Sequence, residues 1–394
     1  MGRRHGWAVG AALVAALTGC TTSIPGTPVA DTSAEVRLDT GGYPTSPRQV
    51  PTRTGADVRV QPSFELGEYL IVPPDLQAGF DDGAKTAVPS LPSVVAIAAD
   101  LGEKQALILA HDRYVGGAIS ANQRAAEPGV AEPPRMTTYL LRYQTTKAVD
   151  EVSAKIKALP RTTAEAKGLP GRPESFEAPA VSDGSAPVWY IPRGDYLLGV
   201  AFKGIPRAEA ESLANRWVDR QIPKLAELKL TADEMLSMPA DRDGILSYTI
   251  PGVETIEDVQ FELGYMRPRT WAQLVVTKWA DSIALMERAG VDLVGSGATK
   301  VFRARDAASA RYYADAERQT SSSYVNTYTT TAAPAGVPGA RCGTGKTTAN
   351  GTERAYYTCN VVVGRYYAQT GSVSTIQQAH QQISAQYLIL QSAK

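Results

Sequence analysis

The stretch PVWYIPRGDYLLGVAF, residues 187–202, decides the fold of the first half of the chain. It holds two runs rich in aromatic and aliphatic residues, 188–191 and 196–202, on either side of Pro-Arg-Gly-Asp. Turn residues between two such runs predict an antiparallel β-hairpin. The stretch YYTCNVVVGRYYA, residues 356–368, has the same form around Gly364 and Arg365 and predicts a second hairpin.

Each predicted hairpin is preceded by a strand and a helix and is followed by another helix. In the first half, these elements are expected at 136–143, 148–159 and 210–225. In the second half, they are expected at 298–304, in an alanine-rich segment through Tyr312 and Tyr313, and at 376–390. The repeated order predicts two similar α+β domains, each an antiparallel or mixed sheet with helices packed on one face. Phe64-Glu65-Leu66-Gly67 also recurs at 261–264, although four identical residues are close to chance.

The N-terminus has the pattern of an export signal. Arg3 and Arg4 precede an uncharged run that ends in Leu17-Thr18-Gly19-Cys20, and the run is too short to span a bilayer as a mature helix. The last four residues resemble the lipobox of bacterial lipoproteins, in which the cysteine carries lipid and becomes residue one. We therefore expect a lipid anchor on Cys20 at the outer face of the cytoplasmic membrane. The arginines lack the flanks of a strict twin-arginine signal, which favours the general secretory route.

These features predict the division of the chain. Residues 1–19 are expected to be a signal peptide, and 20–58, rich in Thr, Ser, Pro and Gly, a flexible tether. The N-terminal domain is expected at 59–230 and the C-terminal domain at 245–394, with the boundary between Leu225 and Leu246.

Two cysteines remain after Cys20, namely Cys342 and Cys359. In an exported chain such a pair predicts a disulfide, which would contribute roughly 3 kcal/mol by closing a loop of about 17 residues. The alternative is two free buried thiols. His111 and His380 lie far apart in the sequence, and a zinc centre needs three or four clustered ligands. We therefore expect neither a metal site nor a cofactor.

Composition and motifs exclude several other classes of protein. The 394 residues include 40 Lys and Arg and 40 Asp and Glu, so the chain lacks the basic excess of a nucleic-acid binder. The segment 342–348 resembles a phosphate loop, but Ala340 stands where that motif needs glycine, so no nucleotide is expected. Asp241 and Asp243 resemble part of a calcium loop whose first and last ligand positions are Pro239 and Ile250. Ser182, Ser185, Asp81 and Asp82 lie in segments without the partners of a hydrolase site.

Tyrosine is unusually frequent, with 18 Tyr against 6 Phe. Tyr356, Tyr357, Tyr366 and Tyr367 lie in the second hairpin and are candidates for a binding surface, because a tyrosine ring is apolar with a polar tip. The alternative is that they are ordinary residues of half-exposed strands.

Residues 38–48, LDTGGYPTSPR, are too specific for a plain spacer, and we expect them to dock on the N-terminal domain. Together with the lipobox, the paired halves and the Cys342/Cys359 hairpin, they resemble an uncharacterised family of envelope lipoproteins from mycobacteria and related actinobacteria. That resemblance implies location, domain plan and disulfide, but no chemistry. Gly42 stands where asparagine is common in that family. The last third is also faintly similar to the sensor domains of mycobacterial receptor kinases.

We therefore expect a non-catalytic envelope lipoprotein that serves as a binding or accessory module. It would contact the membrane through its lipid and would bind a lipid, a glycan or an envelope protein. The alternatives are a hydrolase of envelope polymers, which would need clustered buried carboxylates or a Ser-His pair, and a structural scaffold without a ligand.

Overall fold

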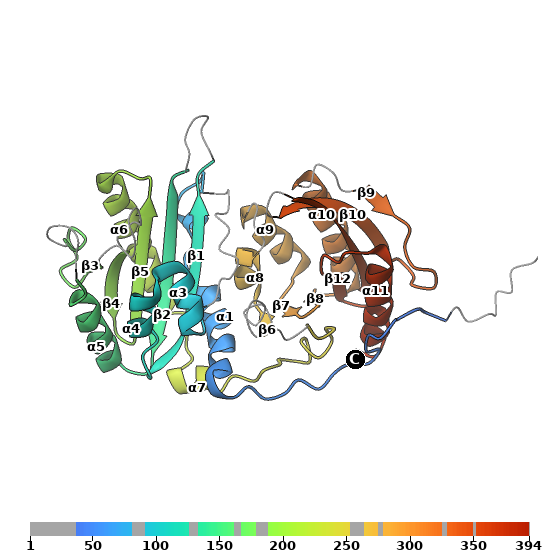
Figure 1. Ribbon diagram of the computed structural model, residues 1–394, viewed down its shortest axis with the longest axis horizontal. Coiled ribbons are helices and arrows are strands. Elements are labelled where there is room, and N and C mark those ends of the chain that lie inside the picture. The colour runs from blue at the N-terminus through green and yellow to red at the C-terminus, as the bar shows by residue number, and fades with distance from the viewer. Residues whose placement is uncertain are drawn as a thin grey trace, which may run out of the picture. The chain divides into compact units, whose positions relative to one another are not determined.

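The computed structural model of the protein describes residues 37–80, 91–125, 133–160, 167–178, 188–252, 264–274, 279–324, 329–349 and 352–393. The chain divides into two units, Met1–Arg37 and Leu38–Lys394. Both sheets of the protein lie in the second unit (Figure 1). Within the described residues, the structure contains no helix long and apolar enough to cross a membrane.

The N-terminal domain is built on a five-stranded antiparallel sheet with the order β1-β2-β5-β4-β3. Its strands are β1 (Tyr114–Gln123), β2 (Arg135–Tyr143), β3 (Phe176–Ala178), β4 (Val188–Arg193) and β5 (Tyr196–Lys203). Its helices are η1 (Gly55–Arg59), α1 (Val60–Tyr69), α2 (Pro73–Leu76), α3 (Val94–Leu101), α4 (Glu103–Leu109), α5 (Thr146–Lys157), α6 (Arg207–Leu225) and α7 (Ala232–Leu236). The first predicted hairpin is β4 and β5, with Arg193 paired to Tyr196.

Both faces of this sheet are buried. Leu140 of β2 and Leu198 of β5 pack in a core with α6 on one face. Their neighbours in the same strands, Leu141 and Leu197, pack in a second core with α3, α4 and α5 on the other face. The expectation that helices would cover one face is therefore wrong for this domain. The physical reason is visible in the strands, because consecutive apolar residues point to opposite faces and each face then needs a cover.

Helix α5 illustrates how local sequence determines these elements. The side chain of Thr145 accepts a hydrogen bond from the Ala148 backbone N–H at 3.2 Å, which caps the first turn. Val149, Val152 and Ile156 follow at helical spacing and are fully buried. The predicted apolar face of this helix is thus the face that packs on the sheet.

The C-terminal domain is built on a seven-stranded antiparallel sheet with the order β6-β7-β8-β12-β11-β10-β9. Its strands are β6 (Gly264–Met266), β7 (Leu293–Ser296), β8 (Thr299–Arg303), β9 (Thr329–Thr331), β10 (Arg341–Ala349), β11 (Thr352–Val363) and β12 (Tyr366–Thr370). Its helices are α8 (Pro268–Leu274), α9 (Trp279–Ala289), α10 (Ala307–Tyr324) and α11 (Ile376–Gln391). Phe302 packs with α9 and α10 on one face, and Val301 packs with α11 on the other. Here too, helices cover both faces.

The two domains repeat one plan. In chain order, β1, β2, α5, β3, β4, β5 and α6 correspond to β7, β8, α10, β10, β11, β12 and α11, and the corresponding strands occupy the same order in each sheet. The predicted α+β class with two similar domains is confirmed. The short recurrence of Phe-Glu-Leu-Gly plays no part in this repeat, because residues 64–67 lie in α1 while Gly264 begins β6 and 261–263 fall outside the described residues.

Helix α1 lies between the domains and contacts both. The Gly117 backbone N–H of β1 donates to the Ser63 side chain at 3.2 Å. On the other side, the Thr270 hydroxyl of α8 donates to the Phe64 carbonyl at 2.7 Å, and the Gln61 amide donates to the Tyr265 carbonyl at 2.8 Å. The helix is therefore buried along almost its whole length.

Candidate functional site

Residues 38–54, here called the strap, run across the C-terminal domain and lead into η1 and α1 (Figure 1, in blue). The Tyr43 hydroxyl accepts hydrogen bonds from the amides of Gln378 and Gln382 on α11, at 3.3 and 3.2 Å. The Gln381 amide donates to the Asp39 carboxylate at 3.1 Å. Gly41 has a φ of +54°, a left-handed conformation that favours glycine, and it lies against the end of the Gln381 side chain.

The strap docks on the C-terminal domain, and the expectation that it would dock on the N-terminal domain is wrong. The reason is the row of glutamines at 378, 381 and 382 on α11, which offers amide donors to the Tyr43 hydroxyl and the Asp39 carboxylate. The predicted tether of 20–58 is therefore structured from residue 38 onwards, while 20–36 lie outside the described residues.

The far end of the strap is fixed by a tight turn. The Arg48 backbone N–H donates to the Ser247 carbonyl at 3.1 Å. The Asp241 carboxylate accepts from the backbone N–H groups of Leu246 and Ser247, at 2.7 and 2.9 Å. Asp243 pairs with Arg303 at 3.0 Å. Both carboxylates of the calcium-like segment thus have protein donors: Asp241 shapes the turn that receives Arg48, and Asp243 ties that turn to β8.

A pocket of about 170 Å³ lies where the strap reaches η1 and α1. The strap lines it with Arg48 and with residues 50–54, and Asp57 and Val60 form the wall next in sequence. Ala240 and Leu246, from the segment between α7 and β6, close the other side. We call this the strap pocket.

Two arginines dominate the charge of the strap pocket. Burial lowers the pKa of the Arg53 guanidinium, the Asp57 carboxylate raises it, and the positive charge of Arg48 lowers it again. An arginine remains charged in a protein under such influences. Arg48 and Arg53 therefore bring two positive charges close enough to repel one another, next to a single carboxylate of the lining.

The lining determines what chemistry the pocket can support. Its titratable groups, among the described residues, are Arg48, Arg53 and Asp57, and its hydroxyls are those of Thr52 and Thr54. A guanidinium recognises an anion, but it supplies neither a nucleophile nor a base at neutral pH. The arginines of the described lining are therefore suited to holding an anion.

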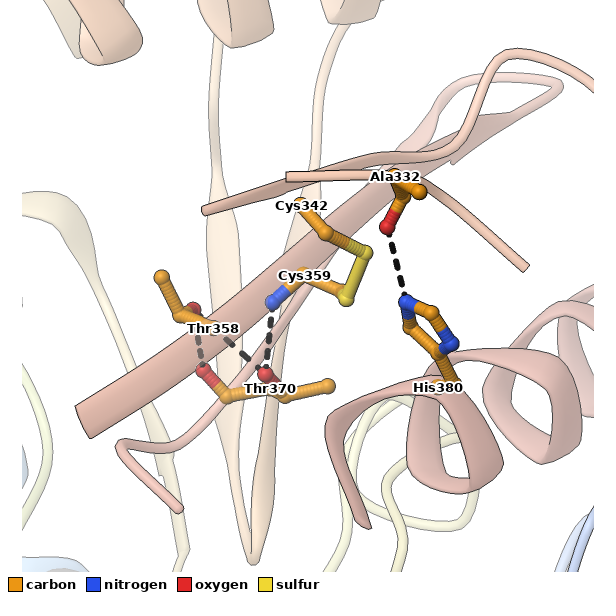
Figure 2. Close-up of a disulfide and its surroundings, with 6 residues drawn as sticks. All are labelled: Ala332, Cys342, Thr358, Cys359, Thr370 and His380. Atoms are coloured by element: carbon orange, nitrogen blue, oxygen red, sulfur yellow. Dashed lines mark hydrogen bonds between the residues drawn. A yellow bond between two sulfur atoms is a disulfide. The ribbon is translucent and has the colours of Figure 1, made fainter. Parts of the chain in front are cut away.

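The predicted cysteine pair forms a disulfide between β10 and β11 (Figure 2). Cys342 and Cys359 are directly opposite in the sheet, and the Cys359 N–H points away from β10 to donate to the Thr370 side chain at 2.9 Å. The cysteines therefore occupy a non-hydrogen-bonded pair, where Cα atoms of neighbouring strands approach most closely. Their Cα atoms are 4.1 Å apart, and both side chains are buried against α11.

His380 of α11 stands beside this disulfide, although it is far away in sequence (Figure 2). A ring nitrogen and both sulfurs lie within 4.8 Å of one another. Helix packing, which sequence spacing does not reveal, brings them together. His380 Nε2 also lies 2.8 Å from the Ala332 carbonyl oxygen. Metal ligation by cysteine requires thiolates, and here the two sulfurs are bonded to each other.

The four candidate tyrosines do not form one surface. Tyr367 is fully buried with Phe302 and Tyr313, and Tyr366 is buried on the opposite face of the sheet, against Tyr248. Neither can offer an exposed ring. Tyr356 and Tyr357 are half-buried neighbours on β11, and burial raises the pKa of Tyr356. Adjacent residues of a strand point to opposite faces, which separates both pairs.

Several other residues singled out from the sequence have no described position. Cys20, Asp81, Asp82, Ser182 and Ser185 all lie outside the described residues. The strap pocket itself was missed by the sequence reasoning. Its signal was RQVPTR, residues 48–53, which places two arginines in a Pro- and Thr-rich stretch otherwise assigned to a spacer.

The chain has a second buried charged group at the boundary of the domains. Burial raises the pKa of Glu68, more strongly than Arg267 and Arg269 lower it. The Glu68 carboxylate accepts from the Arg269 backbone N–H at 3.0 Å, and Arg267 bonds Glu65 at 3.2 Å. These groups join α1 to the start of α8 and so hold the domains together.

Comparison with known proteins identifies the family of the chain. No curated protein and no solved structure matches it. Residues 50–240 match the N-terminal domain model of unknown function DUF7373, and residues 263–393 match the corresponding C-terminal domain model. Both models belong to one two-domain plan, and together they span most of the chain. The protein therefore belongs to the DUF7373 family.

Proposed function

We propose that the protein is a non-catalytic lipoprotein of an actinobacterial cell envelope that binds a small ligand in the strap pocket. It is exported, cut before Cys20 and held by lipid on that cysteine at the outer face of the cytoplasmic membrane. The N-terminal pattern of basic start, apolar run and Leu17-Thr18-Gly19-Cys20 supports the anchor.

The observation that carries the binding role is the composition of the strap pocket. A concave site with a few convergent polar groups is the usual form of a ligand site. Arg48 and Arg53 bring two positive charges to the pocket, and its one described carboxylate, Asp57, lies close enough to Arg53 to raise the pKa of that guanidinium, so the described lining is suited to an anion. Binding is the activity that this set of side chains supports.

The disulfide supports export. Disulfides persist in oxidising compartments outside the cytoplasm, and Cys342 and Cys359 are joined in a buried position on two neighbouring strands.

A hydrolase would need a perturbed carboxylate, and Glu68 is one. Its oxygens, however, accept from the backbone of Arg269 and Thr270 between two packed helices. That geometry assigns Glu68 to holding the domains together. A scaffold without a ligand is the remaining alternative, and the experiment below separates it from the proposal.

The test is native mass spectrometry of the protein extracted from its own envelope, before and after gentle organic extraction. We expect a mass that corresponds to cleavage before Cys20 with added acyl groups, and a further non-covalent mass that extraction removes. Ala240→Trp fills the strap pocket and should abolish the non-covalent mass. Ala154→Trp, on the exposed side of α5, is the matched control and should retain it. A bare acylated chain in the wild type would contradict the binding role and favour a scaffold.

A further inference from the structure

We propose that the strap pocket binds a phosphate group, carried by a small phosphoester or by a phospholipid headgroup. This proposal rests on the binding role proposed above and names the class of its ligand.

The charge of the pocket selects an anion with more than one binding edge. Arg48 and Arg53 both line it, and their charges influence one another. A guanidinium is a planar fork that matches two oxygens of an anion. A carboxylate has two oxygens in one plane and is matched by one fork, whereas a phosphate presents three or four oxygens in different directions. Two forks on one short loop therefore suit phosphate better.

The hydroxyls of the lining fit the same ligand. Thr52 and Thr54 alternate with Arg53 along the strap and line the pocket with it. A hydroxyl can donate to a phosphate oxygen that the arginines leave unbound. Asp57 balances part of the positive charge and so offsets part of the repulsion between the two arginines.

The size of the pocket limits how much of the ligand enters. Its volume of about 170 Å³ is below the roughly 300–1,000 Å³ typical of sites for drug-sized ligands. A phosphate with a few attached atoms matches this space, but a pair of acyl chains does not. If the source is a phospholipid, the headgroup enters and the chains remain outside.

The strap is fixed to the C-terminal domain at Tyr43 and again at Arg48, where the pocket begins. Tyr43 is bonded to α11, and the Arg48 backbone is bonded to the turn that Asp241 stabilises. After the strap, the chain continues directly into η1 and α1. A loop fixed in this way loses little conformational freedom on binding, which favours affinity.

The experiment uses the full mature chain with Cys20→Ser, so that no lipid is attached. Inorganic phosphate and glycerol phosphate are titrated by calorimetry at low salt, and cosedimentation is measured with vesicles of phosphatidylglycerol and of phosphatidylcholine. Arg48→Gln and Arg53→Gln retain much of the side-chain volume but remove the charge. We expect each to weaken phosphate binding at least about tenfold, the range for losing a charged hydrogen bond. Arg193→Gln, at an exposed turn of the N-terminal sheet, is the matched control and should leave binding unchanged.

Each outcome decides the proposal. Saturable binding of glycerol phosphate that the two variants weaken supports a soluble phosphoester. Binding only to phosphatidylglycerol vesicles, weakened by the same variants, supports a headgroup. Equal affinity for sulfate or glucuronate would overturn the assignment to phosphate. If no phosphate source binds while native mass spectrometry still finds a ligand lost in Ala240→Trp, the phosphate assignment fails and the binding role stands. If neither is found, both fail.

Discussion

Replacing both Cys342 and Cys359 by alanine should lower the free energy of unfolding of the C-terminal domain by about 3 kcal/mol. The disulfide joins residues 17 apart in the sequence, and loop closure of that length restricts the unfolded chain by about this amount. Both side chains are buried, at 2% and 0% exposure, so alanine introduces no unsatisfied polar group. The native hairpin should survive, because β10 and β11 pair along nine residue positions.

The measurement is amide hydrogen exchange of β10 and β11 followed by mass spectrometry, together with denaturant unfolding. A loss of about 3 kcal/mol corresponds to roughly a hundredfold faster exchange of the amides that open with the domain. Exchange in α5 and α6 of the N-terminal domain serves as the internal reference. Wild-type protein refolded in a reductant should show the stability of the double variant, whereas the double variant should not respond to reductant.

A loss below about 1 kcal/mol would refute this reasoning. It would mean that the disulfide does not restrict the unfolded chain, or that packing of the hairpin against α11 offsets the lost constraint. A reductant effect on the double variant would be equally damaging, because no other described cysteine remains.

Three further predictions concern the strap and the domain boundary. Tyr43→Phe removes the hydroxyl that accepts hydrogen bonds from two amides of α11, so it should weaken docking of the strap by about 1–2 kcal/mol. The measurement is the rate of tryptic cleavage after Arg48, which should increase, with Tyr312→Phe as the control. An unchanged rate would show that the strap is held elsewhere. Gly67→Ala places a Cβ 2.7 Å from Thr270 Oγ1 and should destabilise the protein by about 1–3 kcal/mol despite the better helix propensity of alanine, and a raised denaturation midpoint would contradict this. Burial raises the pKa of Glu68 in the folded state, so near this pKa the folded protein binds more protons than the unfolded chain. The free energy of unfolding should therefore fall as pH rises from the unfolded pKa of 4.5 through the higher folded pKa. Glu68→Gln should flatten that part of the stability profile, and a profile as steep as that of the wild type would exclude Glu68 as its source.

The elements that sequence predicts well are those whose partners are close along the chain. The faces of α5 and α11 and the hairpin of β4 and β5 follow from spacings within a few residues, and the structure has them at the expected positions. The pairing of Cys342 with Cys359 also follows from local context, since only one pair remains after Cys20.

Features that depend on distant packing could not be predicted in this way. His380 reaches the disulfide because α11 folds back over β10 and β11, and Tyr43 reaches the same helix from more than 300 residues earlier in the chain. The cover on both faces of each sheet was foreseeable from pairs such as Leu140-Leu141, as was the separation of Tyr366 from Tyr367. The strap pocket was not, because a stretch rich in Pro and Thr has the composition of a linker until its partner surface is known.

The position of α1 has a consequence for how the protein matures. The segment is synthesised early, yet Phe64 and Gln61 find their partners on β6, about 200 residues later. Domains usually acquire structure in the order in which they emerge from the ribosome. For this chain, the side of α1 that packs on the second domain stays exposed to solvent until the second domain has formed. Completion of the first half therefore depends on the second, and a chain that stops between them leaves an apolar helix open to aggregation or proteolysis.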